Sequence, residues 1–353
     1  MIRDVPNGHA DPITVSVERR GPQAPGPRQP KEVMVQDGAS AQTKITRLID
    51  NVSRVILGKR ESVEHAVIAL LCGGHILIED VPGVGKTMLA RSVARSTGCS
   101  FGRIQFTPDL LPSDITGVSV YNQQSGEFEF RAGPIMAQMV LADELNRTTP
   151  KTQSALLEAM EEHQVTVDGT THALPRPAMV LATLNPIEYE GTFPLPETEL
   201  DRFLVRLHLG YPDKEDEIRV LEAQQYVHPV EELEPVVDEN DLVALQNAVR
   251  GIYVSDDVKE YIVAIADATR NHGSLYLGAS PRGSLALFRL VQAKALLEER
   301  DYALPDDVKA LAYPALGHRV ILSSAARIQG TTSADAIADV LEQTPVAGAL
   351  PGA

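Results

Sequence analysis

Short apolar runs alternate with helix-like segments from Thr43 to about Gly210. The runs occupy residues 75–80, 102–107, 139–144, 178–185 and 203–209. Continuous apolar runs of this length are typical of strands that are buried on both faces of a parallel sheet. The pattern therefore predicts an α/β domain over residues 41–211, built on a parallel five-stranded sheet.

The pattern changes after Pro212, where long amphipathic segments follow one another without a convincing strand among them. These segments are residues 215–225, 241–250, 256–270 and 283–300. They predict a second, all-helical domain over residues 212–330. The two ends have little to bury: residues 1–40 are proline-rich and lack aromatic residues, and residues 331–353 are mostly small. We expect a disordered N-terminal tail and a flexible C-terminal tail.

The charge of the chain argues against nucleic acid as a partner. The formal net charge is −16, and the N-terminal tail carries as many basic as acidic residues, so the predicted domains hold the whole excess. An acidic surface repels a phosphate backbone. The longest apolar stretch, residues 66–78, is interrupted and too short to span a bilayer, and the N-terminus lacks the apolar core of a signal peptide. Cys72 and Cys99 show no metal-ligand spacing. A cytoplasmic protein without membrane insertion is expected.

A glycine-bearing loop joins the first apolar run to a helix-like segment. The loop ends in Gly83, Gly85, Lys86 and Thr87. Glycines let backbone N–H groups surround phosphates at a helix N-terminus, a lysine reaches the β and γ oxygens, and a hydroxyl binds Mg²⁺. The usual first glycine of such a loop is Asp80 here, and its carboxylate either repels the phosphates or faces away and caps the loop. The sequence leaves both alternatives open.

Polar residues also follow two further predicted strands. Asp143 and Glu144 end the run at 139–144, and adjacent carboxylates after a buried strand suit Mg²⁺ binding and polarisation of an attacking water. The alternative is a solvated turn. Asn185 follows the run at 178–185, where its amide could bind the attacking water and the γ-phosphate, or simply form a turn before proline.

Two arginines are candidates for contact with a nucleotide. Arg202 precedes the last predicted strand and could act on a neighbour's nucleotide, or pair with Asp201 at the surface. Arg282 follows a predicted cap at Ser280, with Pro281 at the first helical position. A cation in the first turn opposes the helix dipole unless an anion lies nearby, so we interpret Arg282 as directed at the γ-phosphate.

Five motifs, in the order VPGVGKT, LADELNR, TLNP, LPETELDRF and ASPRGSLAL, together resemble the MoxR branch of the AAA+ ATPases. The resemblance covers roughly residues 43–325 and implies a three-layer αβα domain, a helical lid and assembly into hexameric rings that bind ATP and Mg²⁺. It makes Lys86 and Thr87 the Walker A pair, Asp143 and Glu144 Walker B, Asn185 sensor 1, Arg202 the arginine finger and Arg282 sensor 2. It also implies a nucleotide-binding set of Gly58, Val81, Pro82, Gly83, Val84, Gly85, Lys86, Thr87 and Met88, with Thr87 and Asp143 at the metal.

The MoxR group also resembles magnesium-chelatase ATPase subunits and replicative helicases in carrying two hairpin insertions. Residues 121–130 and 165–174 read as strand, glycine-containing turn and strand. The second hairpin has no lysine or arginine, which argues against a DNA translocator. Tyr121, Phe128 and Phe130 either grip a polypeptide or pack within their hairpin. In the helix expected over residues 150–164, the acidic positions, Glu161 among them, are expected to form a solvated face.

The resemblance favours a chaperone-like ATPase that remodels partner proteins, with a von Willebrand factor A domain protein as a plausible partner. One alternative is a nucleotide-dependent assembly switch with little hydrolysis. The presence of both Glu144 and Asn185 argues against it. The other is a DNA helicase, which the acidic body and the uncharged second hairpin disfavour.

Overall fold

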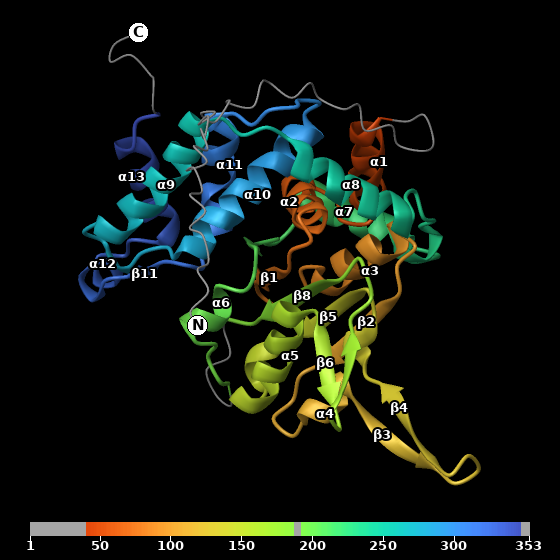
Figure 1. Cartoon of the computed structure of the whole chain (residues 1–353). Coiled ribbons are helices and arrows are strands. Elements are labelled where there is room, and N and C mark those ends of the chain that lie inside the picture. The colour runs from red at the N-terminus through yellow and green to blue at the C-terminus, as the bar shows by residue number, and fades with distance from the viewer. Residues whose placement is uncertain (1–39, 187–191, 347–353) are drawn as a thin grey trace, which may run out of the picture. The chain divides into compact units, whose positions relative to one another are not determined.

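The computed structural model describes residues 40–186 and 192–346 (Figure 1). The predicted disordered tail over residues 1–40 lies outside these ranges except for Ser40. That residue is the N-cap of the first helix, α1 (Ala41–Ser53), and its hydroxyl accepts a hydrogen bond from the Thr43 N–H at 3.1 Å. None of the helices in the described ranges is long and apolar enough to cross a bilayer.

Five parallel strands form the central sheet, as the apolar runs predicted. They are β1 (Ile76–Glu79), β2 (Phe101–Gln105), β5 (Met139–Asp143), β8 (Met179–Leu184) and β9 (Val205–Leu207). Their order across the sheet is β2-β5-β8-β1-β9. The carboxyl ends of β5, β8 and β1 therefore meet at one edge, which is where ligands bind in open α/β sheets.

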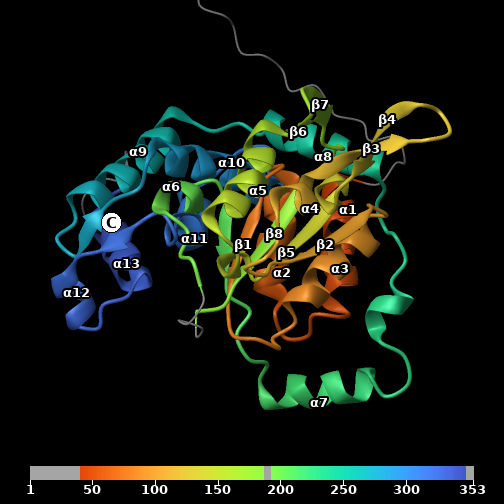
Figure 2. The same cartoon turned by 90° about the horizontal axis from the view of Figure 1, so that it is seen from below.

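Both faces of the sheet are buried. Successive residues of a strand pack into two different hydrophobic clusters, one on each face. Ile76 and Ile78 pack with α1, α2 (Arg60–Leu71) and α3 (Lys86–Ser96), whereas Leu77 packs on the other side with α4 (Pro112–Thr116) and α5 (Pro150–Glu162). This alternation follows from the two-residue period of a strand. The domain therefore has the expected αβα layers, with the helices above and below the sheet in Figure 2.

Two antiparallel hairpins occupy the predicted places. The first pairs β3 (Gly117–Asn122) with β4 (Glu127–Ala132), and the second pairs β6 (Gln164–Val167) with β7 (Thr170–Ala173). The rings of Phe130 and His172 stack at 3.8 Å and join the hairpins. Tyr121 and Phe128 contact each other but stay exposed, so the aromatic positions divide between packing and an accessible pair.

Three short helical segments lie within the core, and two more, the last of those named here, connect the core to the lid. They are η1 (Pro134–Met136), η2 (Leu145–Arg147), α6 (Glu197–Leu200), α7 (Lys214–Ala223) and η3 (Pro229–Glu232). The lid is helical, as expected, and comprises α8 (Glu239–Gly251), α9 (Asp256–Asn271), α10 (Pro281–Leu297), α11 (Pro305–Leu316), α12 (Ser324–Ile328) and α13 (Ser333–Gln343). It adds one short antiparallel pair that the pattern did not predict, β10 (Leu275–Leu277) with β11 (Ile321–Leu322).

The flexible tail expected from residue 331 onward is wrong for most of its length. A reciprocal capping box between Thr332 and Asp335 starts α13, and the buried Ala336, Ile337 and Val340 attach that helix to the lid. Three apolar residues on one helical face are enough to anchor a short helix, but too few to stand out from a stretch of small residues. Residues 347–353 lie outside the described ranges.

Candidate nucleotide site

The loop between β1 and α3 leaves backbone N–H groups available. Gly83 and Gly85 have φ values of 88° and 97°, which residues other than glycine rarely adopt. Gly85 is the N-cap of α3, and no side chain caps that helix. The first N–H groups of α3 therefore lack a side-chain acceptor, and with the helix dipole they form an anion-binding end.

The ammonium group of Lys86 lies between β1 and β8. It donates to the backbone carbonyl of Asp80 and, at 3.3 Å, to that of Leu184. Burial lowers the pKa of Lys86, and the charges of Asp80, Asp143 and Glu144 oppose that shift. The fold thus brings together the lysine and the two carboxylates that the sequence placed in one site.

The side chain of Asp80 faces away from the loop glycines. One carboxylate oxygen accepts from the Leu209 N–H at 2.7 Å and the Gly210 N–H at 2.6 Å, and the other accepts from the N–H of Val81 at 2.9 Å. The side chain is almost fully buried, with 9% of the residue exposed. Of the two alternatives that the sequence left open, the structure selects the cap: Asp80 joins the start of the phosphate loop to the segment that leaves β9.

Asp143 is held by two groups on neighbouring strands. One carboxylate oxygen accepts from the Thr183 hydroxyl at 2.8 Å, and the other pairs with Arg103 of β2 at 2.7 Å. The same Thr183 hydroxyl accepts from the Glu144 N–H at 2.8 Å. No local sequence pattern singles out Arg103 and Thr183, because only the strand order places β2 and β8 on either side of β5.

Glu144 adopts a conformation that is uncommon for its residue type. Its φ of 59° lies in the left-handed region, and such residues concentrate at functional sites. Its carboxylate accepts from the Gln105 amide at 2.7 Å and lies 3.4 Å from the Arg147 guanidinium. Gln105 stands opposite Asp143 in the β2–β5 register, a relationship that the sequence does not give.

Asn185 follows the last residue of β8 and is 4% exposed. Its backbone carbonyl accepts from the side-chain amide of Asn146 at 3.4 Å. Because β5 and β8 are adjacent and parallel, Asn185 and the carboxylates of Asp143 and Glu144 leave the sheet at the same edge. Asn185 therefore belongs to the same site.

A cavity of about 190 Å³ lies beside the phosphate loop. Its walls come from the loop itself, from the turn between α1 and α2, and from the segment after β9 together with α7. The lining is Arg54, Val55, Ile56, Leu57, Lys59, Gly83, Val84, Gly85, Met88, Gly210, Pro212, Val220, Ala223, Gln224, His228 and Pro229. Gly58 is not among these residues. Its φ is 70°, and a Cβ there would collide with the carboxylate of Asp216, so this glycine makes room for α7 against the turn.

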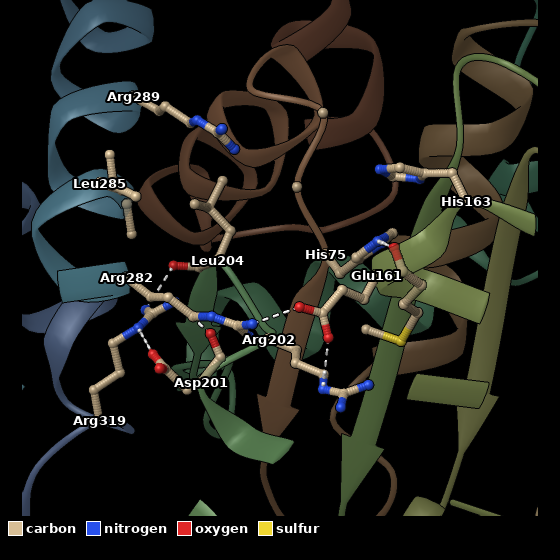
Figure 3. A pocket seen from close by; sticks show the side chains of 14 residues that line it. His75, Glu161, His163, Asp201, Arg202, Leu204, Arg282, Leu285, Arg289 and Arg319 are labelled. Carbon is tan, nitrogen blue, oxygen red and sulfur yellow. Dashed lines mark hydrogen bonds and ion pairs between the residues drawn. The ribbon is translucent and has the colours of Figure 1, made fainter. Parts of the chain in front are cut away.

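Arg202 and Arg282 do not line that cavity. They meet instead in a second one of about 400 Å³ between core and lid, where both pair with Glu161 of α5 (Figure 3). The Arg202 guanidinium lies 3.3 Å from Glu161 and 3.2 Å from Glu199. Glu161 is exposed, as expected for the solvated face of α5, but it also holds both guanidiniums. As expected, Ser280 caps α10 and Pro281 is its first residue.

Asp201 pairs with a lid residue rather than with Arg202. The buried guanidinium of Arg319 lies 2.7 Å from the Asp201 carboxylate and donates to the carbonyls of Asp201, Phe203 and Leu204. Ser280 donates to the same carboxylate at 2.7 Å. Arg319 thus fastens the lid to the residues around Arg202. No local sequence signal marks it, because its partners lie more than a hundred residues away.

Comparison with known families identifies both parts of the chain. Residues 75–205 match the family model described as ATPase family associated with various cellular activities (AAA), and residues 267–340 match the AAA lid domain. The first match contains the phosphate loop, Asp143, Glu144, Asn185 and Arg202. The second contains Arg282 and Arg319 and extends through most of α13.

Three relatives cover most of the chain. The uncharacterized protein YeaC of Bacillus subtilis is 53% identical over 300 residues, which are 85% of this chain and 94% of YeaC. Chaperone MoxR1 of Mycobacterium tuberculosis is 40% identical over 297 residues, which are 81% of this chain and 78% of that protein. A crystal structure of an inferred ATPase from Cytophaga hutchinsonii superposes with a TM-score of 0.81 at 40% identity, over 87% of this chain and 96% of that one. The site's geometry, the matched AAA and lid regions and these relatives together show that the chain belongs to the MoxR family of AAA+ ATPases.

Proposed function

We propose that this protein hydrolyses ATP with Mg²⁺ in sites shared between neighbouring copies of a ring, and that it uses the hydrolysis to remodel partner proteins. The observation that carries the proposal is the separation of two sets of residues. Lys86, Asp143 and Glu144 gather at the phosphate loop, whereas Arg202 and Arg282 line another cavity of the same copy.

The residues at the loop fit a nucleotide and a divalent cation. The N-terminus of α3 has no side-chain cap, and the Lys86 ammonium is held there by carbonyls, which phosphate oxygens can replace. Asp143 and the Thr87 hydroxyl are oxygen donors of the kind that Mg²⁺ prefers. ATP would supply the phosphoanhydride bond, and Mg²⁺ would offset its charge. Glu144, positioned by Gln105 and Thr183, would orient and polarise the attacking water, and Asn185 would hold it.

The two arginines would complete the site of a neighbouring copy. They are joined through one carboxylate, Glu161, so a single approaching anion would meet both guanidiniums together. Arginines that act in this way on a transferring phosphoryl group contribute on the order of 10³–10⁵ in rate. The presence of Glu144 and these arginines favours an ATPase over a switch that scarcely hydrolyses, because a switch does not need groups that stabilise the transition state.

Mixing two inactive variants tests whether sites are shared. Glu144→Gln removes the water-polarising carboxylate, and Arg202→Ala removes the trans arginine, so each variant alone should lose turnover while still binding ATP. A mixture should recover activity at every junction where an intact Glu144 meets an intact Arg202. A mixture as inactive as its parts, from copies shown to assemble together, would contradict shared sites.

The remodelling role is supported by the name of the relative Chaperone MoxR1 and by one exposed feature. Tyr121 and Phe128 remain 53% and 74% exposed on the first hairpin, where apolar side chains are available to a polypeptide. Tyr121→Ala with Phe128→Ala should abolish stimulation of the ATPase by an unfolded protein such as casein. Basal hydrolysis should persist, and the exposed Glu127→Gln on the same hairpin serves as the control. A hexameric ring, a von Willebrand factor A domain partner and a cytoplasmic location belong to the same proposal.

A DNA helicase remains the less favoured function. The described part of the second hairpin, β6 to β7, contains no lysine or arginine that could follow a phosphate backbone. DNA binding that weakens steeply with salt would favour it over protein remodelling.

A further inference from the structure

Helix α7 has almost no tertiary support of its own. Among its ten residues only Asp216 is buried, while Ile218 and Leu221 are 47% and 70% exposed. Figure 2 shows α7 standing off the sheet and the helices that cover it. An isolated helix of this length is only marginally stable in water, and tertiary packing of an apolar face usually supplies the missing stability. The apolar face of α7 therefore lacks the contact that would stabilise it.

The two faces of α7 have different surroundings. One face carries Asp216, which lies against Gly58, and Val220 and Ala223, which line the nucleotide cavity. The opposite face follows from the helical period of 3.6 residues and carries Ile218 and Leu221, flanked by Glu217 and Glu222. A protein that binds to this outer face would consequently lie next to the nucleotide cavity.

The outer face combines the two apolar residues with Glu217 and Glu222, and the helical period places Lys214 on it as well. Over residues 211–224 there are five carboxylates and two basic side chains, a difference of −3. Asp216 pairs with Arg219. Glu217 and Glu222 form no ion pair with any residue in the described ranges, so both are available to a basic partner.

A basic surface with an exposed leucine lies beside the cavity that Arg202 and Arg282 line. Arg289 of α10 and Arg250 at the end of α8 share a cavity of about 280 Å³ whose lining contains no carboxylate. Neither guanidinium forms an ion pair within residues 40–186 and 192–346. Arg289 also lines the cavity of Arg202 and Arg282, together with Leu285, which is 57% exposed. Figure 3 shows Leu285 and Arg289 on the same stretch of α10 as Arg282.

We propose that the outer face of α7 docks on a second copy of this chain, at the surface formed by Arg250, Leu285 and Arg289. This inference rests on the proposed shared site. If Arg202 and Arg282 of one copy approach the nucleotide cavity of the next, α7, which is a wall of that cavity, approaches the surface beside those arginines. Leu285 then covers Ile218 and Leu221, and the two free guanidiniums face Glu217 and Glu222. Charge complementarity of this kind fixes register and suppresses wrong pairings.

Docking of this kind would couple the nucleotide cavity to assembly. Val220 and Ala223 are attached to the same short helix as Ile218 and Leu221, so a contact on the outer face orders the inner one. A copy without a neighbour would leave that wall of the cavity poorly ordered. Assembly would therefore tighten ATP binding, and by thermodynamic reciprocity ATP would favour assembly.

A charge-swap experiment on the full chain tests the contact. The acidic pair is reversed by Glu217→Arg with Glu222→Arg, and the basic pair by Arg250→Glu with Arg289→Glu. We expect each double variant to weaken ATP-dependent assembly at least about tenfold, measured by sedimentation velocity, because like charges then face each other. The quadruple variant restores opposite charges and should recover most of the assembly. Asp257→Arg with Glu260→Arg on α9 is the matched control for charge alone.

The outcomes separate this contact from the shared-site proposal. The variant reversed at Glu217 and Glu222 should bind a fluorescent ATP analogue as the dilute wild-type monomer does, because neither residue lines the nucleotide cavity. If the wild-type chain assembles and its inactive variants complement each other, yet both double variants assemble normally, the docking of α7 is wrong and shared sites stand. Failure of the quadruple variant to recover would equally overturn the pairing with Arg250 and Arg289. A wild-type chain that never assembles would remove both proposals.

Discussion

The carboxylate of Asp80 accepts the backbone N–H of Gly210 at 2.6 Å, which connects the first residue of the phosphate loop to the chain that leaves the last strand. That chain continues into α7, and Gly210 itself lines the nucleotide cavity. Lys59 supports the same segment by donating to the Tyr211 carbonyl at 2.8 Å. A single buried carboxylate thus fixes two walls of the cavity relative to each other.

Replacing Asp80 by glycine, the residue more usual at this position, should weaken nucleotide binding. The backbone N–H groups of Leu209 and Gly210 would lose a charged acceptor, a contribution of about 1.5–3 kcal/mol for each bond. We expect the dissociation constant for ATP to rise about tenfold, corresponding to about 1.4 kcal/mol. Asp80→Asn keeps an acceptor oxygen and should retain most of the affinity. Tighter binding by the glycine variant would mean that the carboxylate acts chiefly by repelling phosphate.

Arg103 should compete with Mg²⁺ at Asp143, because its guanidinium lies 2.7 Å from a carboxylate oxygen. Arg103→Met removes the cation while keeping a side chain of similar length. The Mg²⁺ concentration for half-maximal ATP hydrolysis should fall several-fold. An exposed arginine elsewhere, Arg327 of α12, replaced in the same way, is the control. An unchanged or higher Mg²⁺ requirement would show that Arg103 serves to position Asp143 rather than to occupy it.

Acid should destabilise the core through His75. Burial lowers the pKa of His75 to about 4, and its Nδ1 accepts the Val180 N–H at 3.0 Å, which a protonated nitrogen cannot do. In the unfolded chain the group titrates near 6.5, so this stability is fully present above about pH 6.5 and falls as the pH drops toward 4. Between pH 7.5 and 5 the loss from this residue is about 2 kcal/mol in the free energy of unfolding.

Urea unfolding at both pH values measures that loss. His75→Gln should be less stable at neutral pH but lose less stability on acidification. His318, whose pKa burial lowers well below its usual value, acts in the same direction and accounts for a residual slope. A His75→Gln variant with the full wild-type pH dependence would contradict this assignment.

The C-terminal helix α13 should contribute to the stability of the lid. Ile337 is 1% exposed and packs in the main hydrophobic cluster, so Ile337→Ala should cost about 2–4 kcal/mol. Ile328, on α12 and 88% exposed, offers the same substitution at the surface and should change stability by less than about 0.5 kcal/mol. Equal effects of the two substitutions in thermal unfolding would mean that α13 is not anchored in solution.

The chain alone determined the five strands of the main sheet, the longer helices and most residues of the candidate nucleotide site. Strand runs and the glycine loop are local patterns, because burial on two faces and the conformation of a phosphate loop each dictate residue types at short spacing. Lys86, Asp143, Glu144 and Asn185 could therefore be assigned before their distances were known. Ser280 and Pro281 likewise specified the start of α10 by local chemistry alone.

Tertiary structure decided whatever depends on pairing between distant segments. The direction of Asp80, the contacts of Arg103 and Gln105, the role of Arg319 and the meeting of Arg202 with Arg282 at Glu161 all join residues from different elements. A sequence gives the residue types but not the strand order or the position of the lid, and these set which charges come within a few ångströms of one another. Short helices such as α13 follow the same rule, since their stability comes from the surface that they cover.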